Sequence, residues 1–223
     1  MSQHPQSEHP TTHPADVPDG AGLDELRAAA RECHGCPLWE PATQTVFGSG
    51  SAAARMLFVG EQPGDVEDRR GQPFVGPAGR LFDDALVDAG IDRSLTYVTN
   101  AVKHFHFRPT PKRRLHQTPT VEHVTACRPW LDAELAVVAP EVVVCLGATA
   151  ARALLGQDFR ITRQRGTLMP FEGPSAAEEA GVHSAWILAT THPSAVLRTP
   201  DEERQKAYDA LVHDLTVAAG ALA

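Results

Sequence analysis

Apolar residues fall into two patterns along the chain: short unbroken runs, and longer stretches with a helical period. The unbroken runs predict buried strands at residues 56–60, 96–102, 141–146 and 185–190. Helical spacing predicts helices at residues 23–32, 80–89, 121–139 and 202–219, with a further helix directly after Gly147. Because strands and helices alternate, we expect an α/β fold of three layers, α/β/α, around a central, mainly parallel sheet of about four strands.

Two segments lack both patterns. Residues 1–20 are rich in Pro, His, Ser and Thr and have scarcely an apolar side chain, so burial cannot offset the entropy lost on ordering. We therefore predict a disordered tail at residues 1–20 and a single domain at residues 21–223. A Ser-, Glu-, Ala- and Gly-rich insertion near residues 172–183 indicates an exposed loop.

The composition is typical of a globular protein, with 42% hydrophobic and 22% charged residues. No apolar run approaches the ~20 residues that span a bilayer, and the N-terminal residues lack the features of a secretory signal. We therefore expect a cytoplasmic protein with no membrane partner and no disulfides. Since neither a heptad repeat nor an extended apolar patch is apparent, we expect a monomer.

The charge is distributed unevenly. A net charge of -8 argues against a protein that coats nucleic acid nonspecifically. Residues 93–121, however, contain no Asp or Glu and carry six basic residues: Arg93, Lys103, Arg108, Lys112, Arg113 and Arg114. Composition alone favours a solvated basic loop over a nucleic-acid contact.

The cysteines indicate a metal or redox site without defining it. Cys33 and Cys36 form a C-x-x-C pair, and Cys127 lies far along the chain. Cys145 stands inside an apolar run and is expected to be a core residue. His104 follows a predicted strand and could supply a fourth ligand, since imidazole replaces thiolate in some iron–sulfur sites. Spacing does not separate zinc, a cluster, a redox pair or a structural role.

Six motifs carry a family resemblance: GEQPGDVEDRRGQPFVGPAGRL, YVTNAVKHF, KRRLHQTP, ACRPWL, VVVCLGATAA and HPSAVLR. In this order and spacing, from residue 33 to residue 198, the sequence resembles the family 4 uracil-DNA glycosylases. It is most similar to their X-type subgroup, in which Gln replaces Ala at the position of Gln62 and a basic loop ending in histidine follows the second strand.

The resemblance implies a four-iron four-sulfur (4Fe-4S) cluster. Its ligands would be Cys33, Cys36, His104 and Cys127. Ordinary family 4 members have cysteine at the position of His104, so this chain departs from them in the same place as the X-type proteins. Cleavage at uracil needs no redox step, so we expect the cluster to be structural.

The resemblance also implies a pocket for a uracil flipped out of DNA. Asn100 would read O4 and N3–H of the base, although an Asn directly after a strand is also common in turns. Phe74 would stack on the base, although taken alone it is equally a loop aromatic anchored in the core. His192 would donate a hydrogen bond to uracil O2 as the base leaves with negative charge.

In the X-type proteins, a histidine at the position of His116 attacks C1′ and bonds the protein to DNA. The resemblance makes Glu61 the acid that orients His116 or takes its proton, and Gln62 a residue that positions the base or the loop. Gly60 fits a tight turn that lets backbone groups approach the base. Composition alone favours a His116 that merely touches phosphate.

The expected substrate is uracil-containing DNA, single-stranded or double-stranded. Ser194 and Arg198 are expected to contact phosphate or to support their loop, and Ser194 could equally cap a helix. Lys112, Arg113 and Arg114 are expected to attract DNA phosphates. Two alternatives stay open: a glycosylase that turns over with water, and a noncatalytic iron–sulfur module that binds DNA.

Overall fold

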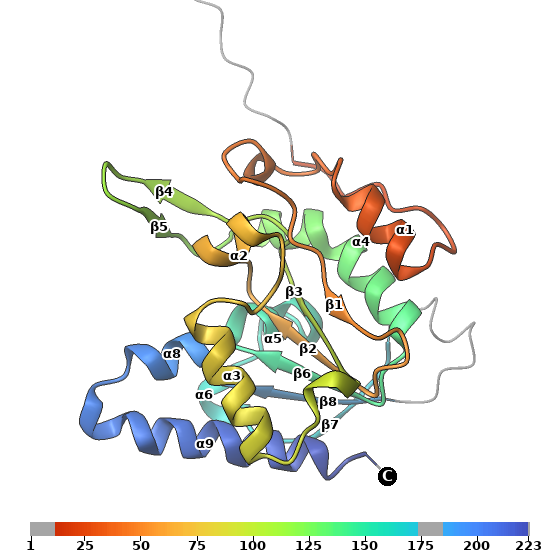
Figure 1. The fold of residues 1–223 in the computed structure, drawn as a ribbon. Coiled ribbons are helices and arrows are strands. Elements are labelled where there is room, and N and C mark those ends of the chain that lie inside the picture. Colours follow the sequence, from red (N-terminus) through yellow and green to blue (C-terminus); the bar gives the residue numbers. More distant parts are fainter. Residues whose placement is uncertain (1–11, 174–184, 223) are drawn as a thin grey trace, which may run out of the picture.

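The computed structural model describes residues 12–173 and 185–222 and has a six-stranded sheet at its centre (Figure 1). The strand order is β1-β3-β2-β6-β8-β7. The four inner strands are parallel: β3 (Thr96–Asn100), β2 (Met56–Gly60), β6 (Val142–Leu146) and β8 (Ala185–Thr190). The two edge strands, β1 (Ser49–Gly50) and β7 (Met169–Phe171), are antiparallel to their neighbours.

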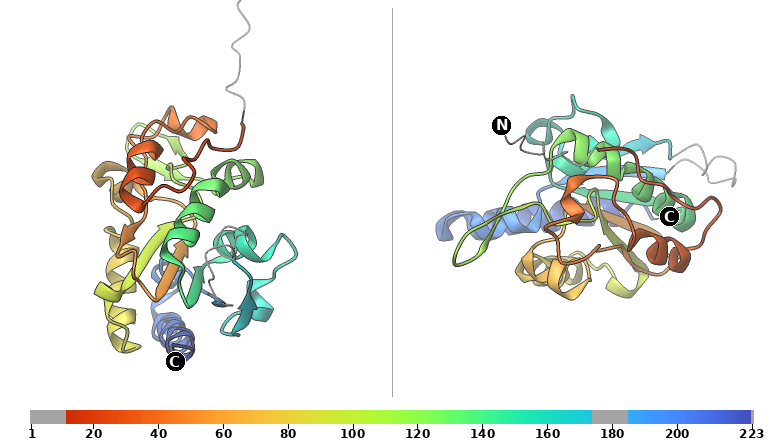
Figure 2. Two further views of the ribbon diagram at one scale, coloured as in Figure 1. Left: turned by 90° about the vertical axis from the view of Figure 1, so that its right-hand side faces the viewer. Right: turned by 90° about the horizontal axis from the view of Figure 1, so that it is seen from above.

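Helices cover both faces of this sheet (Figures 1 and 2). One face packs against α4 (Val121–Val138) and α5 (Ala148–Leu155), and α1 (Leu23–Ala30) lies on α4. The other face packs against α3 (Pro77–Asp88), α8 (Pro193–Arg198) and α9 (Asp201–Ala219). The remaining helices in the described residues are α2 (Asp65–Arg70), α6 (Ile161–Gln164), η1 (Pro37–Trp39) and η2 (Arg93–Leu95).

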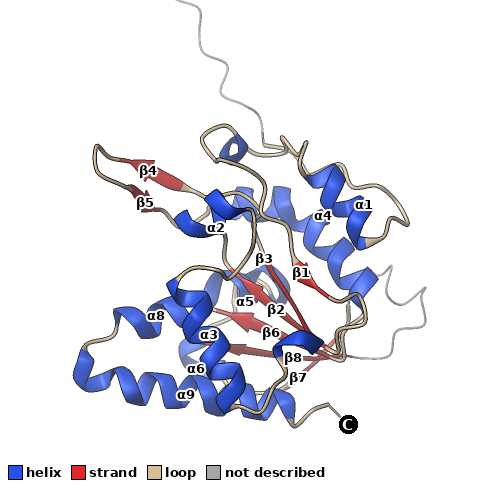
Figure 3. Ribbon diagram, viewed as in Figure 1, coloured by secondary structure: helices blue, strands red, loops and turns tan. Residues whose placement is uncertain are grey.

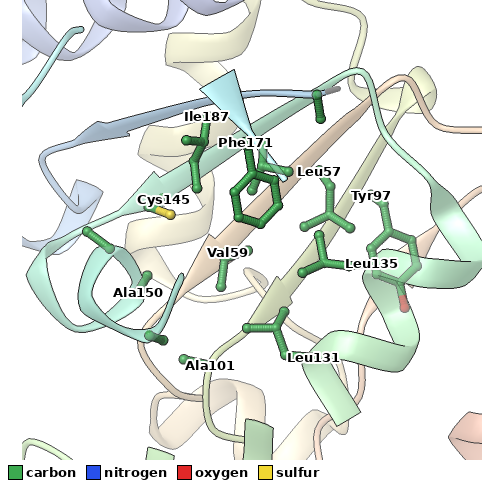
Figure 4. Close-up of a cluster of buried hydrophobic side chains, with 14 of the residues drawn as sticks. Leu57, Val59, Tyr97, Ala101, Leu131, Leu135, Cys145, Ala150, Phe171 and Ile187 are labelled. Atoms are coloured by element: carbon green, nitrogen blue, oxygen red, sulfur yellow. The ribbon is translucent and has the colours of Figure 1, made fainter. Parts of the chain in front are cut away.

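The unbroken apolar runs form the inner strands because helices cover the sheet on both sides. All five residues of β6 are fully buried, and alternate side chains enter opposite clusters. Cys145 points into the cluster that also contains Leu57, Val59 and Ile187, so the prediction that it is a core residue is confirmed (Figure 4).

The predicted fold class is confirmed, with two edge strands that the prediction did not include. β1 has two residues and contains Gly50 with φ of 138°, and β7 has three residues including Pro170. Segments this short show no period-two pattern, and proline is depleted in strands. The predicted parallel strands are the inner four.

The basic segment is not an irregular loop. Residues Phe107–Pro109 (β4) and Arg114–His116 (β5) pair as an antiparallel hairpin, which projects from the body of the molecule (Figure 3). The predicted insertion near residues 172–183 falls almost wholly within residues 174–184, outside the described residues. No helix in the described part of the chain is long and apolar enough to cross a membrane.

The described part of the predicted tail, residues 12–20, contacts the domain through His13 and Ala15. The His13 amide donates to the Gly35 carbonyl at 2.8 Å, and the Ala15 amide donates to the Ala126 carbonyl at 2.9 Å. Ala15 is buried among residues of α1 and α4. Backbone pairing orders this segment although it has few apolar side chains.

Candidate active site

A cavity of about 670 Å³ lies beyond the carboxyl ends of the inner strands, where ligands bind in parallel α/β sheets. Leu146 and Asn100 line it from the ends of β6 and β3, and Glu61 and Gln62 follow β2 directly. The cavity brings together most of the predicted site residues: Glu61, Gln62, Phe74, Asn100, His116, His192, Ser194 and Arg198.

Gly60 makes room for two of these side chains. A Cβ on Gly60 would collide with Asn100 Oδ1 and would lie 2.9 Å from Phe74 Cζ. Gly60 therefore lets an amide and an aromatic ring meet at the end of β2. Phe74 has φ of 57°, a costly backbone conformation outside glycine.

The Asn100 side chain is 3% exposed and contributes to the cavity wall. Among the described residues its amide has no hydrogen-bond partner, and no fully buried side-chain polar atom is left unsatisfied. The amide is therefore available to a ligand. One side-chain amide offers both a donor and an acceptor, which suits a base edge that presents a carbonyl beside an N–H.

His192 is a neutral donor by geometry. Its Nδ1 accepts a hydrogen bond from the backbone N–H of Ser194 at 3.1 Å, and the Ser194 hydroxyl lies 2.8 Å from the same atom. Nδ1 is thus unprotonated, and the ring proton is on Nε2. Burial lowers the pKa of His192 to about 4, and the positive charge of Arg198 acts in the same direction. His192 therefore stays uncharged at neutral pH.

The His116 ring, unlike that of His192, is half-exposed and has the Glu61 carboxylate beside it. Its Nε2 is 3.3 Å from Glu61 Oε1 and 2.9 Å from Gln62 Nε2. The other Glu61 oxygen accepts a hydrogen bond from the Thr149 hydroxyl at 2.5 Å, which fixes the carboxylate. Burial lowers the pKa of His116, while the Glu61 charge opposes this shift. Because Gln62 Nε2 can only donate, His116 Nε2 is unprotonated, and the arrangement places its lone pair in the cavity beside a carboxylate.

Comparison with known proteins gives the family. Residues 47–216 match the family described as the uracil DNA glycosylase superfamily. The chain belongs to this superfamily. A type-4 uracil-DNA glycosylase of Thermotoga maritima is 37% identical over 185 residues, which cover 82% of this chain and 88% of the relative. A type-4 uracil-DNA glycosylase of Archaeoglobus fulgidus is 35% identical over 179 residues, covering 80% and 84%.

A more distant relative is similar over a shorter range. A type-5 uracil-DNA glycosylase of Pyrobaculum aerophilum is 32% identical over 160 residues, which cover 65% of this chain and 63% of the relative. The family match begins at residue 47, so it leaves out the segment with Cys33 and Cys36.

In this member of the superfamily, Gln62 joins the hairpin to the sheet. Its Oε1 accepts from the His106 amide at 2.9 Å, and its Nε2 donates to the carbonyls of His106 at 3.2 Å and Gln117 at 3.0 Å. His106 and Gln117 flank the two hairpin strands. Gln62 thus positions the loop that carries His116, one of the two roles that the sequence left open for it.

Arg114 anchors the hairpin instead of pointing to solvent, which corrects its assignment as a phosphate contact. Its guanidinium binds the carboxylates of Asp65 and Asp68 and lies 4.8 Å from the centre of the Phe107 ring. Lys112 and Arg113, by contrast, are exposed at the hairpin tip, where DNA phosphates could reach them. Lys103 is also unavailable to DNA, because it is fully buried.

The cysteine region gathers three thiols. Cys33, Cys36 and Cys127 are close enough for their charges to interact, and all belong to one apolar cluster or its edge. Burial raises the pKa of Cys36, and it raises the pKa of Cys127 to about 12. Two N–H groups point at the sulfurs, Trp130 Nε1 at Cys33 Sγ and the Lys103 amide at Cys127 Sγ, both at 3.2 Å. Buried and half-buried sulfurs with N–H donors fit a bound cation or cluster.

His104 can join this donor set through one nitrogen. The Thr45 hydroxyl donates its only hydrogen to the Ala30 carbonyl at 2.8 Å, so it accepts from His104 Nε2 at 2.9 Å. That leaves Nδ1 unprotonated, as a ligand must be. No three His, Cys, Asp or Glu side chains in the described segments could hold one metal ion together. A cluster needs a wider arrangement, because each ligand binds a different iron atom.

Two further residues at the site were not found by sequence reasoning. The Thr149 hydroxyl fixes Glu61 without lining the cavity itself, and its place in the GATA segment after β6 was a signal that could have identified it. Arg165 lines the cavity while its guanidinium binds Asp214 of α9 at 2.7 Å. Nothing in its local sequence distinguishes it. Ser194 and Arg198 both line the cavity, and Arg198 donates to the Ser194 hydroxyl at 3.2 Å.

Proposed function

We propose that this protein excises uracil from DNA and becomes covalently attached to the abasic C1′ through His116. Uracil-DNA glycosylase activity is supported by membership of the superfamily and by type-4 relatives that align over most of their length. The observation that carries the covalent step is the contact at 3.3 Å between His116 Nε2 and the Glu61 carboxylate inside the same cavity as Asn100 and His192.

Asn100, Phe74 and His192 would bind the flipped base. The free Asn100 amide matches O4 and N3–H of uracil and mismatches the N4 amino group and N3 of cytosine. The Phe74 and His192 rings are near parallel, 27° apart, with centroids separated by 6.2 Å. Phe74 would supply a stacking face, and His192 Nε2–H would donate to O2 as the base leaves.

The reaction would proceed by departure of the base and capture of the sugar. The C1′–N1 bond breaks, and its electron pair leaves with uracil as an anion that His192 stabilises. The lone pair of His116 Nε2 bonds to the oxocarbenium-like C1′, while the Glu61 carboxylate orients the ring and compensates the positive charge of the alkylimidazolium that forms. Loss of its Nδ1 proton to solvent leaves a neutral alkylimidazole, the Glu61 carboxylate and the uracil anion. A neutral imidazole bonded to carbon is a poor leaving group, so the bond persists.

Cys33, Cys36, His104 and Cys127 would hold a 4Fe-4S cluster, which supplies structural cross-linking and no step of the glycosidic reaction. The protein's own contribution there is a set of buried donors from three separate segments. On the DNA side, Lys112 and Arg113 would attract phosphates at the hairpin tip, and Arg198 with Ser194 would contact or support the strand near the cavity.

The test replaces the proposed nucleophile. Purified protein is mixed with a labelled uracil-containing oligonucleotide, heated in SDS and run on a denaturing gel. We expect a shifted band with the wild type, no shifted band with His116→Ala, and some uracil release by His116→Ala because water can reach the same cation. A thymine oligonucleotide and His123→Ala, which removes an imidazole outside the cavity lining, serve as controls.

Each other outcome identifies one of the alternatives. An abasic product without any shifted band in the wild type would indicate a glycosylase that turns over with water. Salt-sensitive binding of DNA with no uracil release, unaffected by Glu61→Gln, would indicate a noncatalytic DNA-binding module. An adduct that persists in His116→Ala would show that another residue is the nucleophile.

A further inference from the structure

A buried ion pair lies beside the cavity without forming part of its wall. The side chains of Lys103 and Glu134 are 1% and 0% exposed, and Lys103 Nζ is 2.5 Å from Glu134 Oε2. Removing two charges from water carries a penalty that their attraction often only offsets. A contribution to stability is therefore a weak explanation for this pair, and the other contacts of Lys103 indicate a different role.

The Lys103 ammonium also holds the backbone of Asn100. Nζ donates to the Asn100 carbonyl at 2.8 Å and to the Thr99 hydroxyl at 2.7 Å, so its three hydrogens are all used. The next amide, that of Ala101, donates to the Gly60 carbonyl at 2.9 Å. The peptide between Asn100 and Ala101 is thus fixed at its carbonyl and at its N–H.

Helix α4 holds Lys103 at two points. Glu134 of this helix binds Nζ, and Cys127, two turns earlier, accepts the backbone N–H of Lys103 at 3.2 Å. The Glu134 carboxylate is itself fixed by the Tyr97 hydroxyl at 2.9 Å and the Gly48 amide at 3.0 Å. A Cβ on Gly48 would collide with that carboxylate, so the chain leaves space for it.

We infer that Lys103 and Glu134 are positioning residues that set the direction of the Asn100 amide and hence the affinity of the pocket for uracil. The amide makes no hydrogen bond within the described residues, so its direction depends on the backbone that carries it. A rotation of the Asn100–Ala101 peptide would turn the Cα–Cβ bond and move the amide off the base edge. The inference rests on the proposed function of Asn100 as the uracil reader.

The experiment compares Lys103→Met with Tyr97→Phe. Lys103→Met removes the ammonium at similar volume, whereas Tyr97→Phe removes one hydrogen bond to the same carboxylate and leaves Lys103 on Asn100. The readouts are the free uracil concentration that halves the rate of uracil processing, the maximal rate, and the midpoint of urea unfolding. Misplacement of a binding group by about 1 Å costs up to roughly a hundredfold.

We expect the urea midpoint to fall in both variants. Only in Lys103→Met should the free uracil concentration that halves the rate of uracil processing rise, by about tenfold. An unchanged requirement in a folded Lys103→Met protein would overturn the inference, since the pair would then be purely structural. If Lys103→Met does not fold, Lys103→Gln provides the same comparison, because it keeps a polar side chain at the buried position and removes the ammonium that holds Asn100. Inactivity of the wild type would instead overturn the proposed function, and the inference with it.

Discussion

At the scale of single residues, two histidines in one cavity are prepared for different tasks by their neighbours. The Ser194 amide fixes the proton of His192 on Nε2, which makes this ring a donor. The Gln62 amide points its donor nitrogen at Nε2 of His116, so this nitrogen carries the lone pair that the proposed capture of C1′ requires, with the Glu61 carboxylate beside it. Both pKa values are lowered, first of all by burial, so both rings are neutral at pH 7.

The rate of adduct formation should therefore fall only in mildly acid solution. Protonation blocks the nitrogen that attacks C1′, and burial, with Arg198 and His106, holds the pKa of His116 below its usual value near 6.5, against the opposing charge of Glu61. The second-order rate constant at limiting DNA reports the free enzyme. We expect it to be constant in mildly alkaline solution and to decline as the pH falls, with a midpoint below the usual value for histidine.

Arg198→Gln provides the matched comparison for this profile. It removes a positive charge that lowers the pKa of His116, so the decline should begin at a higher pH than in the wild type. A midpoint above that of free imidazole in the wild type would contradict a neutral His116 nucleophile.

Part of the candidate site could be predicted from the sequence. Three motif residues, Glu61, Asn100 and His192, line one cavity, as expected. The role of Gln62 as a hairpin anchor, by contrast, depends on carbonyls 44 and 55 positions away, which spacing alone does not reveal.

At the scale of elements, the hairpin of β4 and β5 is the feature that brings His116 to the cavity. Its base is held by Gln62, and its second strand is held by Arg114, which reaches Asp65 and Asp68 on α2. Asp68 is fully buried, and its carboxylate also accepts from the Thr43 amide at 3.0 Å. The hairpin is therefore tied to the rest of the domain on both sides of its loop.

Removing the contacts of Arg114 with Asp65 and Asp68 should lower both the free energy of unfolding and the rate of adduct formation. Arg114→Ala leaves the buried Asp68 charge without its partner, which costs about 3 kcal/mol in the free energy of unfolding. It also frees the strand that ends at His116, so adduct formation should slow by about tenfold or more. Urea unfolding and single-turnover gel assays measure the two effects.

The neighbouring residue offers a control of the same chemistry. Arg113 is exposed at the hairpin tip, so Arg113→Ala should leave the urea midpoint unchanged and weaken only salt-dependent DNA binding. Equal effects of the two substitutions on stability would show that the Asp65 and Asp68 contacts do not hold the hairpin.

The elements differ in how far sequence could predict them. β2 and β8 have the predicted bounds, because long apolar runs between turns define a buried parallel strand. The hairpin was taken for a loop, because a basic, Pro-containing segment has no apolar face and pairs only with itself. The edge strands β1 and β7 were missed because they are too short to show a strand pattern.

At the scale of the whole molecule, three distant segments meet at the cysteine region. The C-x-x-C segment follows α1, His104 follows β3, and Cys127 lies in α4, while the N-terminal residues 12–20 pack over the same cluster through Ala15. The resemblance supplied the proposed ligands, but the N–H donors to sulfur come from tertiary packing, which the sequence does not show. A cluster here would join these segments far more firmly than the apolar contacts of Ala30 and Ala126.

Loss of one ligand should therefore destabilise the entire domain and not only its own loop. Cys127→Ser is expected to lose the visible absorbance of an iron–sulfur cluster and to have a lower urea midpoint. Its release of 3H-uracil should fall only in proportion to the fraction of protein that is unfolded. Cys145→Ala is the control, because Cys145 is equally buried but lies in the core of β6 among Leu57 and Ile187. Cys145→Ala should keep the absorbance, and its free energy of unfolding should fall only by the small contribution of one buried sulfur. Absorbance that survives in Cys127→Ser would remove Cys127 from the ligand set, since this substitution leaves the other proposed donors in place.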